Sequence, residues 1–99
     1  MSSEKIYRLQ FKESALKEWR ALDGSIQSQF KKILARRLTE PRVPQAQLHG
    51  MPDCYKIKLR ALGYRLVYQV ADEVVTVTVI AIGKRERGEV YIRAGGRLR

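Results

Sequence analysis

Three basic side chains alternate along one short segment of the sequence. Lys56, Lys58 and Arg60 occupy every second position after Cys54, and alternate residues of a β-strand project from one face, about 6.6 Å apart. Like charges this close repel one another, and an anion placed between them relieves the repulsion. The stripe therefore predicts a site for phosphate. The alternative interpretation is a sheet face that carries polar residues only because it is solvated.

A second group of cations follows the last predicted strand, at Lys84, Arg85 and Arg87. The ends of strands are where a sheet commonly presents functional groups. Arg65 lies on the strand after the stripe and reaches the same face only in one pairing register. The irregular turn at 61–63 leaves that register open.

The remaining reactive side chains indicate no other chemistry. The single histidine, His49, lies in a predicted loop and has no second imidazole or paired carboxylate to work with. The single cysteine, Cys54, excludes an internal disulfide and a multi-cysteine zinc site, and we interpret it as structural. From the residues alone, Tyr91 is interpreted as an aromatic that packs a terminal helix. We expect no metal and no other cofactor.

The overall charge also favours an anionic partner. The 99 residues hold twenty Lys and Arg against ten Asp and Glu, a formal net charge of +10 at pH 7. Such an excess favours RNA or DNA phosphate. No apolar run approaches the roughly 20 residues of a membrane span, and the first residues lack the apolar region of a secretory signal. We expect one domain over residues 1–99, no membrane contact and a cytoplasmic location.

The periodicity of apolar residues predicts the elements that position these cations. Residues 6–11 alternate, which indicates a strand. Ser14 is the expected cap of a first helix, and Asp23 or Ser25 that of a second helix, which Pro41 ends. The short connection between the two helices predicts an antiparallel hairpin.

Three strands and a short helix are expected after a loop at 42–52. The strands are predicted at 54–60, 64–70 and 74–82. The helix is predicted at 86–94, where Gly95 and Gly96 break it. The order β-α-α-β-β-β predicts a small α+β domain with the helical hairpin packed on one face of an antiparallel-rich sheet. The other face is expected to hold the basic residues in water.

Five motifs spread over nearly the whole chain match a known family. They are 15–20, 50–60 (GMPDCYKIKLR), 63–70, 83–87 and 89–91. Through them the chain resembles the RelE toxins of the RelE/ParE superfamily of bacterial toxin–antitoxin systems. The resemblance implies a RelE-like fold and metal-independent cleavage of messenger RNA in the A site of the 70S ribosome. It also implies a RelB-like antitoxin, and we expect the toxin alone to be a monomer.

The resemblance implies a catalytic set of two strand lysines, two arginines and a tyrosine. The matching positions are Lys56, Lys58, Arg65, Arg85 and Tyr91. Further contacts with RNA are expected from Arg60, Lys84, Arg87 and His49. RelE-like chains tend to have an arginine at the position of His49, so an RNA contact there is expected to be weaker or pH-sensitive.

The reaction that the resemblance implies is attack by a ribose 2′-oxygen on the adjacent phosphate, which yields a 2′,3′-cyclic phosphate and a 5′-hydroxyl. Crowded cations lower the pKa of a lysine and so raise its neutral fraction. Our hypothesis is that Lys58, Lys56 or Tyr91 acts as the base or orients it. Arg65 and Arg85 would stabilise the phosphorane, with Arg85 nearest the leaving group.

Two other functions stay open. A non-catalytic toxin similar to the ParE toxins, which poison DNA gyrase, shares the scaffold without needing the basic set. A plain RNA- or ribosome-binding module needs only positive charge. An Arg85→Ala variant separates these functions, because a nuclease loses cleavage and keeps most of its ribosome affinity, whereas a binding module only loses a little affinity.

Overall fold

The computed structural model describes residues 5–98, and its elements follow the predicted order. The N-terminal elements are β1 (Arg8–Phe11), α1 (Glu13–Arg20), α2 (Gly24–Arg37) and the 3-10 turn η1 (Pro44–Ala46). They are followed by β2 (Cys54–Leu59), β3 (Tyr64–Ala71), the 3-10 turn η2 (Asp72–Val74), β4 (Thr76–Lys84) and α3 (Glu89–Arg97). None of these helices is long and apolar enough to cross a membrane.

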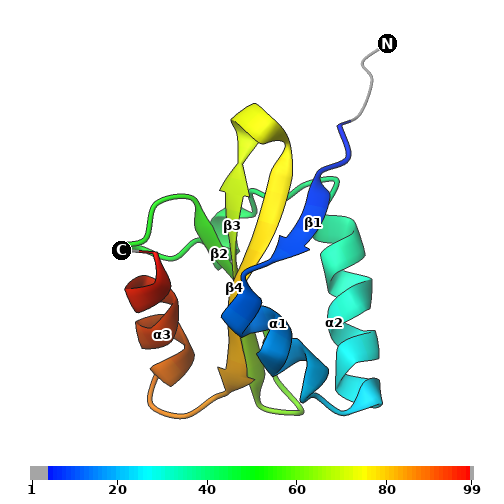
Figure 1. Cartoon of the computed structure of the whole chain (residues 1–99), viewed down its shortest axis with the longest axis vertical. Coiled ribbons are helices and arrows are strands. Elements are labelled where there is room, and N and C mark those ends of the chain that lie inside the picture. The colour runs from blue at the N-terminus through cyan, green and yellow to red at the C-terminus, as the bar shows by residue number, and fades with distance from the viewer. Residues whose placement is uncertain (1–4, 99) are drawn as a thin grey trace.

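The four strands form one sheet in the order β1-β4-β3-β2 (Figure 1). β2 pairs with β3 and β3 with β4 in antiparallel fashion, while β1 lies parallel to β4 at one edge. The predicted small α+β domain with an antiparallel-rich sheet is confirmed. β2 is the opposite edge, so its basic stripe lies at a margin of the molecule.

The helical hairpin of α1 and α2 covers one face of the sheet. Its larger side chains, among them Phe30 and Leu34, pack with Ile57, Leu66 and Tyr68 of the strands in the main core. The Trp19 ring lies 5.4 Å from the Phe11 ring and 6.3 Å from the Phe30 ring, which joins β1 to both helices. The predicted hairpin packing is thus confirmed, and it leaves only the other face for function.

That other face carries a second, smaller core beneath α3, which lies on the opposite side of the sheet from α2 (Figure 1). Cys54, Val67 and Ala81 of the strands pack there with Val90 and Ala94 of the helix. The expectation of a face left in water is therefore partly wrong. Apolar strand residues alternate with the cations, and α3 removes their surface from water.

A β-bulge in β4 places two consecutive residues on the α3 side. Pairing passes from Val67–Ala81 to Tyr68–Val79, so Ile80 is the extra residue. Ile80 and Ala81 both belong to the core beneath α3, whereas Val79 belongs to the hairpin-side core. The bulge sets which side chains at the end of β4 face the helix.

Several element ends differ from the prediction. Lys12, rather than Ser14, is the N-cap of α1. Of the two predicted caps of α2, Asp23 is confirmed as the N-cap, and its carboxylate accepts the Ser25 backbone N–H. β4 starts only at Thr76, because Val75 adopts a left-handed backbone with φ of 47°.

The prediction that Gly95 and Gly96 break the terminal helix is wrong. α3 runs through both glycines to Arg97. It begins three residues later than predicted, because Arg87 and Gly88 have positive φ values of 51° and 70° and cannot continue a helix. Contacts outside the helix therefore compensate for its weak propensity.

Candidate active site on the α3 side of the sheet

The pairing register brings the strand cations together. Lys58 of β2 pairs with Arg65 of β3, and Lys56 pairs with Val67. Because Val67 belongs to the core beneath α3, strand alternation puts Lys56, Lys58 and Arg65 on the α3 side. The register that the turn at 61–63 left open thus places Arg65 directly across from Lys58.

Arg65 is buried, with 8% of its surface exposed. One guanidinium N–H donates to the Tyr64 carbonyl oxygen at 3.2 Å. Among residues 5–98, no carboxylate forms an ion pair with Arg65. A buried arginine without a counter-ion is uncommon. The positive charge of Arg65 is therefore suited to bind an anion.

Arg85 follows β4 and is fixed beside the turn between β2 and β3. Its backbone N–H donates to the Gly63 carbonyl oxygen at 2.6 Å. Its side chain is exposed. This places Arg85 at the end of the sheet where Lys58 and Arg65 lie, although the three residues come from three different strands or their ends.

The electrostatics of this group are centred on Lys58. Its pKa lies below the ordinary lysine value, chiefly because of repulsion by Lys56, with smaller contributions from desolvation and from Arg60, Arg65 and Arg85. A lowered pKa raises the fraction of neutral amine near neutral pH. Lys58 is therefore the side chain here that is best suited to take a proton from a hydroxyl.

Tyr91 comes from α3 and packs against the core that α3 covers. It is half-buried and lies on the same side of the sheet as the lysines. The interpretation as a packing aromatic agrees with this position, and the expected role beside the cations stays a prediction. The placement of Tyr91 depends on how firmly α3 is held.

Glu18 of α1 holds α3 in place. Its carboxylate accepts the Ile82 backbone N–H at 3.0 Å and two N–H groups of Arg97 at 2.8 and 2.9 Å, and it also pairs with Arg93. Arg97 donates to the Ile80 carbonyl oxygen as well. One carboxylate thus ties α1, β4 and α3 together.

The four expected RNA contacts divide into two groups. Arg60 lines a surface hollow of about 280 Å³ together with Lys56 and Lys58, and Arg87 is exposed in the turn before α3. Lys84 pairs with Tyr64, whose ring belongs to the hairpin-side core, so alternation turns Lys84 away from the site.

His49 is exposed at the other end of β2 from Arg65 and Arg85. The backbone N–H of its neighbour Leu48 donates to the Cys54 carbonyl oxygen, at the start of the strand. Four residues of strand, roughly 13 Å, separate Cys54 from Lys58. The structure therefore places neither Lys84 nor His49 with the cluster around Lys58.

Sequence reasoning missed Arg37, the last residue of α2. Arg37 lines the hollow together with Lys56, Lys58 and Arg60. No local pattern marks it, because its approach to the β2 edge depends on how the helix packs across the sheet.

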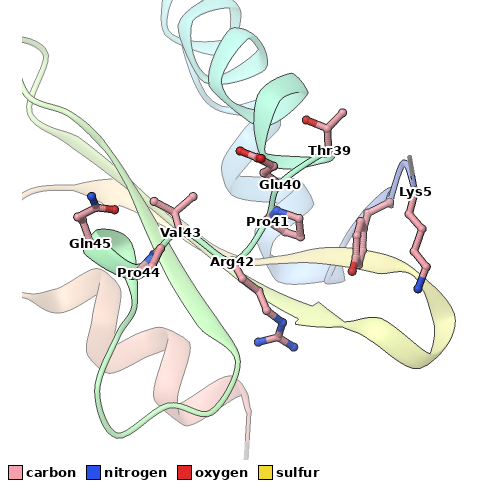
Figure 2. Close-up of a pocket in the computed structure, with 9 residues that line it drawn as sticks. Lys5, Thr39, Glu40, Pro41, Arg42, Val43, Pro44 and Gln45 are labelled. Atoms are coloured by element: carbon pink, nitrogen blue, oxygen red, sulfur yellow. The ribbon is translucent and has the colours of Figure 1, made fainter. Parts of the chain in front are cut away.

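A larger hollow lies elsewhere on the molecule and is less suited to chemistry. It has a volume of about 850 Å³ and is lined by the segment 39–45 with Lys5 and Tyr7 (Figure 2). Arg42, its central cation, is paired with Asp53 at 3.0 Å and Asp72 at 2.8 Å. That charge is already compensated.

Neither the Cys54 thiol nor a group of metal ligands offers an alternative site in the described residues. Burial, helped by the charge of Asp53, raises the pKa of the Cys54 thiol to about 11, which keeps it protonated and unreactive. Within residues 5–98, no group of three His, Cys, Asp or Glu side chains is arranged to hold a metal ion.

Comparison with known proteins decides the family. Residues 9–88 match the model of the family described as the ParE toxin of type II toxin–antitoxin systems. The chain belongs to this toxin family. Among its relatives is the mRNA interferase toxin RelE of Escherichia coli K12, 59% identical over 92 residues, which cover 93% of this chain and 97% of the relative.

Solved structures of this toxin family share the fold. A mutant of the E. coli toxin RelE in the free state matches with a TM-score of 0.87 and 55% identity over 95% of this chain and 99% of that chain. RelE in the intact E. coli RelBE toxin–antitoxin complex matches with a TM-score of 0.79 and 59% identity, over 82% of this chain and 99% of that chain.

Proposed function

We propose that this chain is the toxin of a type II toxin–antitoxin pair and an endoribonuclease that cleaves messenger RNA in the ribosomal A site. Two relatives named mRNA interferases, from E. coli and Shigella flexneri, are 59% identical to it over nearly its whole length. The observation that carries the proposal is the crowding of Lys56, Arg65 and Arg85 around a Lys58 amine of lowered pKa.

The proposed reaction begins with the neutral amine of Lys58, which takes the proton from a ribose 2′-hydroxyl. The 2′-oxygen then forms a bond to the adjacent phosphorus, and the bond from phosphorus to the 5′-oxygen breaks. The departing 5′-oxygen takes a proton from solvent water, and the Lys58 ammonium group returns its proton to solvent. The products are a 2′,3′-cyclic phosphate and a 5′-hydroxyl.

Two arginines stabilise the charge that develops on the phosphorane. Arg65 is buried and lacks an ion-pair partner in the described chain, so its guanidinium is available to the equatorial oxygens. Arg85, exposed at the edge of the site, stabilises the negative charge that develops on the leaving 5′-oxygen. Tyr91 provides a ring on which a base can stack.

The proposed partners follow from the openness of this site. Its cations lie on a surface that binds phosphate at any position but does not by itself bend a message into the geometry for in-line attack. The ribosome is proposed to supply that alignment, which places the chain in the cytoplasm. A RelB-like antitoxin is the proposed inhibitor, since relatives are found in RelBE complexes.

The test uses the purified chain, ribosomes and a defined message with one codon in the A site. We expect a single cut in that codon, a 2′,3′-cyclic phosphate on the upstream fragment and no cut when the attacking ribose carries a 2′-deoxy substitution. Arg85→Ala should abolish cleavage and keep most ribosome binding. A message that stays intact on the ribosome, or is cut as fast when free in solution, would contradict the proposal.

The description of the matched family as ParE toxins favours a second candidate, a non-catalytic toxin directed at DNA gyrase. In that case the chain would inhibit supercoiling by gyrase, and Lys58→Ala would leave the inhibition unchanged. The same variant is expected to lose message cleavage if the first proposal holds.

A further inference from the structure

A cationic hollow lies at the outer edge of β2, beside the proposed catalytic cluster. Its volume is about 280 Å³. The lining combines four cations with three uncharged residues: Arg37, Lys56, Lys58, Arg60, Val43, Gln45 and Ala46. No acidic side chain of the described chain lines it, so the positive charges are not compensated within the hollow.

Arg37 is held in a defined position at this hollow. Its Nη1 donates to the Tyr68 hydroxyl oxygen at 2.8 Å and to the Lys56 carbonyl oxygen at 3.3 Å, and its guanidinium carbon lies 5.8 Å from the centre of the Tyr68 ring. The Tyr68 hydroxyl donates in turn to the Pro41 carbonyl oxygen at 2.6 Å. These contacts fix the guanidinium without neutralising it.

The hydrogen bonds leave most of the Arg37 donors unused. A guanidinium carries five N–H groups in a rigid fork, and within residues 5–98 only those on Nη1 have a partner. A positioned fork with free donors suits bidentate binding of a phosphate. A purely structural arginine would account for the bond to Tyr68, but not for four cations around one hollow.

We propose that this hollow is a second phosphate subsite, in which Arg37 and Arg60 bind a backbone phosphate of the message next to the one that is cleaved. The inference rests on the proposed ribonuclease function. Lys56 and Lys58 line the hollow and also share a face with Arg65, so the two sites adjoin. Arg37 is a substrate-binding residue that stays outside the chemistry.

The first experiment measures single-turnover cleavage on programmed ribosomes by Arg37→Gln, with Arg36→Gln as the matched control. Arg36 is the neighbouring exposed arginine of α2 and does not line the hollow. We expect Arg37→Gln to raise the half-saturating concentration about tenfold, the loss of one charge-assisted contact, with a plateau rate within about twofold of the parent. The control should change neither quantity.

The decisive experiment removes the charge from the RNA instead. A methylphosphonate, which is uncharged, replaces one linkage on either side of the cleaved one. On one of these two messages the parent should bind as weakly as Arg37→Gln does, and the variant should show no further loss. Equal penalties for Arg37→Gln on all messages would overturn the proposal, because the arginine would then contact ribosomal RNA or act only through the fold.

A second variant separates charge from folding. Arg37→Lys retains the charge and loses the fork, so its binding defect should be smaller than that of Arg37→Gln at a similar thermal midpoint. The slope of log affinity against log salt should fall by about 0.7 for Arg37→Gln. The subsite is refuted if the parent cleaves the message, the salt slope of Arg37→Gln equals that of the parent, and the methylphosphonate weakens the parent and the variant equally. If the parent does not cleave, the proposed function itself fails.

Discussion

The chemistry of Lys58 depends on its neighbours more than on its own side chain. Lys56, two positions away on the same strand face, contributes most to lowering the Lys58 pKa. Arg65 and Arg85 add to the effect from two other parts of the chain. The same charges that prepare the amine also attract the phosphate, so base activation and substrate binding share one cause.

Removal of Lys56 should therefore change the pH dependence of cleavage as well as its rate. Lys56→Ala takes away the largest repulsion on Lys58, and the Lys58 pKa rises toward its ordinary value. We expect cleavage at pH 7 to fall at least tenfold and the rising limb of the pH–rate profile to move to higher pH. Lys32→Ala, an exposed change on α2, is the control. A slower reaction with an unmoved limb would exclude this role.

Arg65 illustrates a conflict between stability and function. The residue is buried and has no ion pair in the described chain, which costs stability. Arg65→Met should raise the free energy of unfolding by roughly 1 kcal/mol and reduce cleavage by about 10²-fold or more. Urea unfolding and single-turnover cleavage measure the two effects. Loss of both stability and activity would mean that Arg65 is mainly structural.

The sequence predicted the residues of this cluster better than their arrangement. The alternation around Lys56 and Lys58 was visible, because strand periodicity is local. The pairing of Lys58 with Arg65 was not, because the turn at 61–63 does not fix a register. Arg37 was overlooked because its contacts with Tyr68 and Lys56 join segments that are far apart in the sequence.

Among the helices and strands, α3 depends most on contacts with the rest of the fold for its stability. It has nine residues and two adjacent glycines, and a helix this short is marginal in water even with good helix formers. Packing of Val90 and Ala94 and the ion pairs with Glu18 hold it. The predicted break at Gly95 and Gly96 failed because local propensity does not include these contacts.

The attachment of α3 is expected to weaken in acid. Burial is the largest influence on Glu18 and raises its pKa, but hydrogen bonds from Arg97 and the Ile82 N–H and the charge of Arg93 together outweigh it, so the pKa lies below the ordinary 4.5. A lowered carboxyl pKa stabilises the fold above the unfolded value and loses this effect as the pH falls through the folded value. The NMR signals of Val90 and Ala94 should therefore shift toward those of a detached helix below about pH 4.5.

Glu18→Gln should produce the same shift at pH 7 and remove its dependence on pH. Gly96→Ala is the matched rescue, because a methyl group there meets open space and alanine favours the helix by about 1 kcal/mol. The double variant should regain the parent signals in part. Unchanged Val90 and Ala94 signals in Glu18→Gln would show that packing alone holds α3.

The whole molecule divides its two tasks between the two faces of one sheet. The hairpin side holds the larger core, with Phe30, Leu34 and Tyr68 fully buried or nearly so. The α3 side combines a small core with the cations of the proposed site. Composition gave the net charge and the order of the predicted elements gave the fold class, whereas the division of the faces depends on the bulge in β4 and the docking of α3.

A formal charge of +10 on 99 residues should make salt act in opposite directions on stability and on binding. Self-repulsion destabilises the free chain, and raising NaCl from 20 to 500 mM screens it, so the thermal midpoint should rise by several degrees, equivalent to about 1 kcal/mol for a domain of this size. Affinity for programmed ribosomes should fall over the same range, because phosphate contacts release counter-ions. Differential scanning calorimetry and filter binding measure the two trends. A thermal midpoint that falls with salt would show that ion pairs such as Glu18–Arg97 outweigh the self-repulsion.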